Sequence, residues 1–206
     1  MMPLPWIMVF FPWVGALVLL ALPRLRIAAA VNIGCAGISF LLALALFTLP
    51  HGEQGWTRID ALNLPFVLLA SFVALTTSIF SAATLAHEGF DHWRIRAYHG
   101  AFQVFLGVQY LALLSDNLGV LWVAIEIATL ASVLMVAVHR TPAAMEAAWK
   151  FFMLCGFGIA LALFTLPHGE QGWTRIDALN LPFVLLASFV ALTTSIFSAA
   201  TLAHEG

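Results

Sequence analysis

Charged residues are scarce in this chain of 206 residues. Lys, Arg, Asp and Glu together make up 9% of the sequence, and the net charge at pH 7 is −2. Soluble domains contain roughly 25% charged residues, so this composition lies outside their usual range. Only eight residues are Lys or Arg, whereas a nucleic-acid-binding surface needs such residues in clusters. The composition therefore argues against a soluble domain and against a nucleic-acid partner.

Cysteine is also rare. The two cysteines, Cys35 and Cys155, lie within apolar runs and form no C-x-x-C pair. An iron–sulfur cluster is held by about four thiolates, and the sequence contains no other cofactor motif. We therefore expect two buried, reduced thiols, no cofactor or metal held by this chain, and no redox catalysis of its own.

Long apolar runs are what the sequence has in abundance. It is 63% hydrophobic, and six or seven runs reach the length of about 20 residues that spans a bilayer as a helix. The first run has no Lys or Arg before it, which a secretory signal requires, so we expect a true membrane helix there. The prediction is an all-α, polytopic transmembrane helix bundle. The runs are Trp6–Leu22, Ile27–Leu49, Leu64–Leu85, the short Gly100–Leu114, Leu118–Val138, Ala143–Phe164 and Leu181–Leu202.

Arginine positions predict how these spans are oriented. Loops after the odd-numbered spans hold five arginines, and loops after the even-numbered spans hold two. Because cytoplasmic loops carry the excess of Lys and Arg, the odd-numbered loops are expected in the cytoplasm and the N-terminus outside. The arginines are Arg24, Arg26, Arg94, Arg96 and Arg140 in the first group, and Arg58 and Arg175 in the second.

An internal repeat divides the chain. Ala43–Gly89 recurs without a change as Ala160–Gly206, which is 47 positions at an offset of 117. Repeats in transporter folds are weak in sequence, so this identity indicates a very recent duplication or an error in the assembled sequence. A selected, functional duplication is the alternative. The predicted parts are residues 1–164, a set of membrane helices, and residues 165–206, the remainder of the copy.

Glu126 is the one charged residue of the fifth apolar run. A charge at the bilayer centre costs about 2.5–3.5 kcal/mol on insertion scales, so such residues usually move ions or protons or pair with an opposite charge. The alternative is a structural carboxyl group, kept neutral by burial and hydrogen-bonded within the bundle.

Lys150 enters the sixth run. Thr141-Pro142 is a helix-start signal, and it predicts a tight antiparallel hairpin that brings Glu126 and Lys150 onto neighbouring helices. Counted from Arg140, the two residues lie about 21 Å and about 15 Å into the membrane. Two alternatives remain for Lys150: a local pair with Glu146, four residues earlier, or a side chain that snorkels to the interface.

Other polar residues have weaker signals. Gln103, Gln109, Thr129 and Ser132 are candidates to hold water within the bundle, with ordinary polar helix packing as the alternative. Three histidines and two acids fall in the predicted loop between the third and fourth spans. Their spacing does not favour a metal site, and a solvated loop that docks a partner is preferred. These residues are His87, Glu88, Asp91, His92 and His99.

Several motifs resemble one family. Ser115–Glu126, with Ala128–Ala131, resembles the fifth-helix motif of antiporter-like membrane subunits of the hydrogenase-4 component F type. Relatives of that type are the proton-pumping membrane subunits of complex I and the Mrp sodium/proton antiporters. The remaining motifs that fit are His139–Pro142, Glu146–Phe152, Asp60–Asn63, Thr76–Ala82 and Ala86–Glu88.

The resemblance implies roles and partners. Glu126 matches the key glutamate of the fifth helix, and Lys150 matches the lysine common in the sixth; together they imply a proton relay. Glu146, Gln109 and His139 are secondary candidates. The implied partners are other membrane subunits and a peripheral redox arm of one complex, in the cytoplasmic membrane of a bacterium or archaeon.

The resemblance covers about residues 1–164. Family members have about fourteen helices, and the seventh-helix lysine and the second half have no counterpart here. Two alternatives to proton translocation therefore stay open: a structural membrane subunit, and a truncated or misassembled chain without activity.

Overall fold

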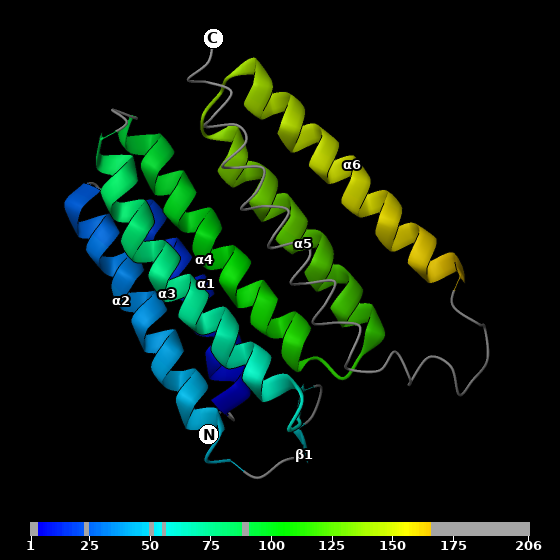
Figure 1. Cartoon of the computed structure of the whole chain (residues 1–206). Helices are drawn as coiled ribbons and strands as arrows, with labels where there is room; N and C mark the ends of the chain where they lie inside the picture. Colours follow the sequence, from blue (N-terminus) through cyan, green and yellow to red (C-terminus); the bar gives the residue numbers. More distant parts are fainter. Residues whose placement is uncertain (1–3, 23–24, 50–51, 55–56, 88–90, 166–206) are drawn as a thin grey trace.

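The computed structural model describes residues 4–22, 25–49, 52–54, 57–87 and 91–165. Across these residues the chain forms six helices and one short β-hairpin (Figure 1). The predicted all-α class is thereby confirmed. The helices are α1 (Leu4–Ala21), α2 (Leu25–Leu46), α3 (Asn63–His87), α4 (His92–Leu114), α5 (Leu118–Ala137) and α6 (Pro142–Thr165), and the strands are β1 (Gly52–Gln54) and β2 (Thr57–Ile59).

Four of the described helices are long and apolar enough to cross a membrane. They include all of α1, most of α2 and α3, and nearly all of α5. Each coincides with a predicted run, and α4 and α6 occupy the predicted fourth and sixth runs. The predicted seventh run, Leu181–Leu202, lies outside the described residues.

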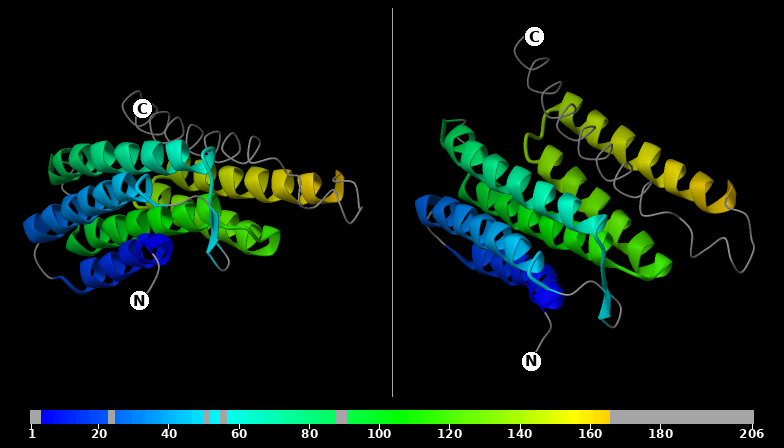
Figure 2. Two further views of the ribbon diagram at one scale, coloured as in Figure 1. Left: turned by 90° about the horizontal axis from the view of Figure 1, so that it is seen from below. Right: turned by 60° about the horizontal axis from the view of Figure 1, so that its bottom comes forward.

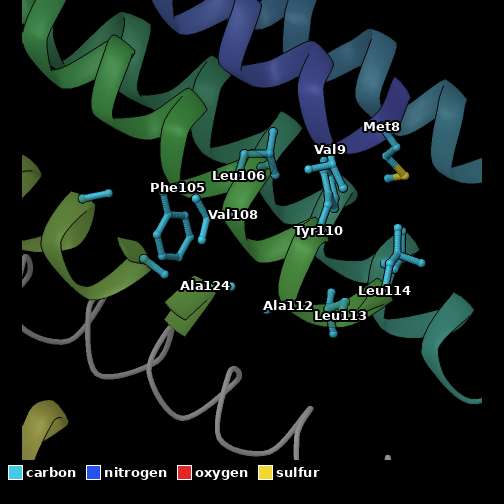
Figure 3. Close-up of a cluster of buried hydrophobic side chains, with 14 of the residues drawn as sticks. Met8, Val9, Phe105, Leu106, Val108, Tyr110, Ala112, Leu113, Leu114 and Ala124 are labelled. Atoms are coloured by element: carbon cyan, nitrogen blue, oxygen red, sulfur yellow. The ribbon is translucent and has the colours of Figure 1, made fainter. Parts of the chain in front are cut away.

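Helix α4 is the centre of the bundle. It packs against α1, α2 and α3 on one side and against α5 on the other, and α6 packs on α5 (Figures 1 and 2). A helix that is buried on all sides belongs in the middle of a bundle. Accordingly, every residue from Phe105 to Tyr110 is buried. The core side chains of α1, such as Met8 and Val9, lie beside Leu106 and Tyr110 of α4 (Figure 3).

The connections at one end of the bundle are tied together. Strands β1 and β2 pair as an antiparallel hairpin between α2 and α3, with Glu53 opposite Arg58. The Arg58 guanidinium lies 3.2 Å from the carboxylate of Asp116, in the α4–α5 turn. Asn63 donates hydrogen bonds to the carbonyl oxygens of Arg58 at 2.7 Å and Leu113 at 3.3 Å. The two even-numbered connections therefore meet at the same end.

The opposite end gathers three other arginines. Arg96 donates a hydrogen bond from Nη1 to the carbonyl oxygen of Leu22, at the end of α1, at 3.1 Å. A cavity of about 420 Å³ at this end is lined by Arg94 and Trp93 of α4 and by Arg140 beyond α5. The alternation of arginines along the sequence thus corresponds to two ends of one bundle. That the end with Arg94, Arg96 and Arg140 is cytoplasmic stays a prediction.

One predicted loop is wrong. The helix α4 begins at His92, eight residues before the predicted start at Gly100, and α3 continues to His87. His99 is fully buried, so it does not belong to a solvated loop. The apolar run stops at the arginines, but the helix continues past them because Ile95 and His99, one turn apart, face the bundle interior.

Candidate functional site

The candidate site is built on the α5–α6 hairpin. Helix α5 is capped by Asn117, whose side-chain oxygen accepts from the backbone N–H groups of Gly119 and Val120. Helix α6 starts at Pro142, and the Thr141 hydroxyl oxygen accepts from the N–H of Ala144 at 3.1 Å. The predicted Thr-Pro start signal is therefore confirmed.

Glu126 lies half-buried on α5. It stands 14 residues before Arg140, and Cys155 of α6 stands 15 residues after Arg140. Two antiparallel helices place such positions at the same depth, and the Glu126 carboxylate is close enough to Cys155 to act on its thiol electrostatically. Among the described residues, the Glu126 carboxylate has no hydrogen-bond or ion-pair partner. Both cysteines are free, and they are partly rather than fully buried.

Lys150 lies on the neighbouring helix, as the hairpin predicts, but it pairs locally. Its ammonium group forms a salt bridge and hydrogen bond with the Glu146 carboxylate, one turn earlier on α6. Both side chains are about two-thirds exposed. Lys150 precedes Cys155 by five residues, or about 7.5 Å along the axis. The structure therefore places Lys150 next to Glu146, about one turn nearer the α5–α6 connection than Glu126.

Three of the four polar residues proposed to hold water come together. Gln109 of α4 and Thr129 and Ser132 of α5 line a cavity of about 10 Å³, closed by Phe105 and Phe151. That volume is close to the minimum of about 10–15 Å³ that holds one water molecule. The Thr129 and Ser132 hydroxyls donate to carbonyl oxygens of their own helix at 3.0 and 2.9 Å, and their oxygens remain able to accept.

The fourth polar residue, Gln103, lies on a different side of α4. Its amide donates to the side-chain oxygen of Asn32 on α2 at 2.8 Å. His139 lies in the turn between α5 and α6, where its backbone N–H donates to the carbonyl oxygen of Val136. It is separated from Glu126 by about 20 Å along α5. Of the secondary candidates, Gln109 lies in the interior between α4 and α5, Glu146 is paired with Lys150, and His139 lies at the end of the hairpin.

Comparison with known proteins identifies a protein of similar sequence. No family model matches the sequence. The chain is 41% identical over 160 residues, or 76% of its length, to a protein of Methylacidiphilum infernorum (isolate V4) named hydrogenase-4 component F homolog. The chain resembles hydrogenase-4 component F. The resemblance inferred from the sequence motifs is thereby confirmed. The matched part amounts to 34% of that relative, so the chain spans about a third of the relative's length.

The resemblance to hydrogenase-4 component F and the four long apolar helices identify an integral membrane protein. The roles of Glu126 and Lys150 stay predictions. The structure also contains a group of buried polar residues apart from the Glu126 site, which the sequence motifs did not reveal. They are Asn32, Ser39, Ser71, His99 and Tyr110. One signal was present in the sequence: His99, Gln103 and Tyr110 follow the helical spacing of a single face of α4.

Proposed function

We propose that this chain is the N-terminal part of a proton-translocating membrane subunit of a membrane-bound hydrogenase or complex I-like oxidoreductase. The observation that carries the proposal is the position of Glu126. It is a half-buried carboxylate without an ion-pair partner among the described residues, on an apolar helix of a chain that resembles hydrogenase-4 component F. The proposed location is the cytoplasmic membrane of a bacterium or archaeon.

The surroundings of Glu126 suit a group that gains and loses a proton. Desolvation in the membrane favours the neutral acid, and a nearby positive charge favours the carboxylate. Lys150 is the nearest candidate for that charge on α6. Its flexible side chain reaches Glu146 in this structure. Exchange of Lys150 between Glu146 and Glu126 would move its positive charge from one carboxylate to the other and so connect the two groups of the relay.

A water position supports the proposed relay. The cavity between Gln109, Thr129 and Ser132 has room for about one water molecule and contains polar atoms from two helices. Thr129 follows Glu126 by three residues, so the two lie on adjacent parts of the same face of α5. A water at this point would extend the polar region from Glu126 towards α4.

Partners are part of the proposal. Helices α5 and α6 expose large apolar side chains, which face lipid, further helices of a longer subunit, or other membrane subunits. We propose that redox chemistry in a peripheral arm of the same complex drives the proton movement. The exposed side chains include Leu130, Leu134, Trp149, Met153 and Leu154.

The deciding experiment replaces Glu126 by glutamine in the complete subunit, within its assembled complex. Glu126→Gln should abolish proton uptake coupled to electron transfer while assembly stays intact, because the amide cannot release a proton. Asp116→Asn is the matched control, since it makes the same change at the end of the bundle, and it should retain coupled uptake. Unchanged uptake in Glu126→Gln would instead favour a structural subunit.

A separate test addresses the truncated-chain alternative. Sequencing of the genomic DNA across Phe164 shows whether the copied segment is real. A conventional seventh-helix sequence at that point would identify the copy as an error, and the proposed function would then be that of the complete subunit.

A further inference from the structure

A second buried polar region lies on the side of α4 that faces α1 and α2. Gln103 is fully buried and donates from Nε2 to the side-chain oxygen of Asn32 at 2.8 Å and to its backbone oxygen at 3.2 Å. His99, one turn earlier on α4, is also fully buried. Neither residue lines the cavity beside α5, so this region is separate from the Glu126 site.

Several polar atoms of this region have no hydrogen-bond partner among the described residues. They are both ring nitrogens of His99, the side-chain nitrogen of Asn32 and the side-chain oxygen of Gln103. All three residues have a relative exposure of 0%. Buried polar atoms in native proteins are nearly always hydrogen-bonded to protein or to ordered water. Four such atoms on three neighbouring side chains therefore point to internal water.

The donors and acceptors balance. The Asn32 amide and one nitrogen of a neutral imidazole donate, whereas the Gln103 oxygen and the other imidazole nitrogen accept. A water molecule that accepts from Asn32 can donate to Gln103 and to His99. Water both donates and accepts, so it suits this set, with a second water molecule needed for the other ring nitrogen of His99.

Further buried polar residues lie on the same faces of α2 and α4 as Asn32 and Gln103. Ser39 follows Asn32 by seven residues and Tyr110 follows Gln103 by seven, so both pairs are spaced by two turns, about 10.5 Å. The Tyr110 hydroxyl is hydrogen-bonded to Ser71 of α3 at 2.8 Å. The Ser39 hydroxyl is close enough to interact with Tyr110, but it forms no hydrogen bond of ordinary geometry within the described part of the chain.

We propose that the interior between α1, α2 and α4 is a water-binding site, in which Asn32, His99 and Gln103 bind the water. Arg96, one turn from His99 towards the arginine-rich end, holds the end of α1 through the carbonyl oxygen of Leu22. Gly15 of α1 faces the site, and a Cβ there would lie 3.9 Å from the Gln103 oxygen and 3.0 Å from the Cys35 sulfur. The site does not depend on the function proposed for Glu126.

Radiolytic footprinting tests the site in the complete chain, reconstituted in lipid nanodiscs. X-rays convert bound water into hydroxyl radicals, which oxidise the side chains beside it. His99 should be oxidised several-fold faster than Met8, although both are fully buried. Met8 is a strict reference because a thioether is easily oxidised. Oxidation of His99 no faster than that of Met8 would overturn the proposal.

Variants locate the water. The double variant Asn32→Leu/Gln103→Leu should reduce the oxidation of His99 to the rate of Met8, because it removes the two amides that bind the water. Thr76→Leu, which makes a polar-to-leucine change at an exposed position of α3, is the control and should leave His99 oxidation unchanged. Undiminished oxidation of His99 in the folded double variant would also contradict the site. If the double variant does not fold, the comparison of His99 with Met8 in the parent chain still decides.

Discussion

At the scale of single residues, the informative one is Lys150, because it has two possible partners. The structure pairs it with Glu146 on the same helix, which is the local alternative that the four-residue spacing predicts. The proposed relay requires it to act on Glu126 across the hairpin. An exposed pair on one helix is weak, so the local contact is compatible with an exchange of partners.

Lys150 substitutions distinguish a proton carrier from a fixed charge. If Lys150 takes up and releases a proton, Lys150→Met should lower coupled proton uptake at least about tenfold, since acid–base groups typically contribute more than that. Lys150→Arg should not restore uptake, because a guanidinium stays protonated. The measurement is proton uptake per electron in the assembled complex. Full activity of Lys150→Arg would show that only the positive charge is needed.

At the scale of the elements, α1 and α4 approach each other closely at Gly107. Gly107 has no side chain at this crossing, and the Trp13 ring and the Val9 carbonyl oxygen occupy the space where one would be. Backbone atoms cannot move aside as easily as the end of a flexible side chain. The crossing positions α4 and, with it, the faces that carry Gln103 and Gln109.

Gly107→Ala should therefore destabilise the bundle. The new Cβ would lie 2.5 Å from the Trp13 ring and 2.8 Å from the Val9 oxygen, and overpacking of this kind typically costs about 1–3 kcal/mol of unfolding free energy. Gly156→Ala on α6 is the control, because no atom lies within 4 Å of its added Cβ. Thermal unfolding in nanodiscs measures both. Equal stability of the two variants would show that α1 can move away at no cost.

The elements also show what the sequence could predict. Apolar length located every described helix, and Thr141-Pro142 located the start of α6. The start of α4 was missed because an apolar run ends at a charge, whereas a helix continues as long as one face is buried. The hairpin of β1 and β2 was missed because strands of three residues show no alternation that a pattern can detect.

The candidate site was predictable in part. Depth counted along α5 and α6 predicted a neighbour for Glu126 on α6, but the side chain at that depth is Cys155, and Lys150 is nearer the turn. The separation of Gln103 from Gln109 was not predicted. Six residues correspond to a rotation of about 240° around a helix, so the two amides point to different sides of α4. Which neighbouring helix each amide faces depends on the central position of α4 in the bundle.

At the scale of the whole molecule, the bundle has two chemically different ends. One is closed by the salt bridge between Arg58 and Asp116, and the other gathers Arg94, Arg96 and Arg140. The even-numbered and odd-numbered connections separate cleanly between these ends. One labelled position at each end can therefore determine the orientation of the bundle in the membrane.

Single cysteines at the two ends test the predicted orientation. Ala61 lies exposed at the Arg58 end, before α3, and His92 lies exposed at the start of α4. Because the arginine-rich end is predicted to be cytoplasmic, a membrane-impermeant maleimide applied to intact cells should label Ala61→Cys and spare His92→Cys. Inside-out vesicles should reverse the pattern. Cys35→Ala/Cys155→Ala provides the background without other thiols. Labelling of His92→Cys in intact cells would place the arginine-rich end outside and contradict the predicted orientation.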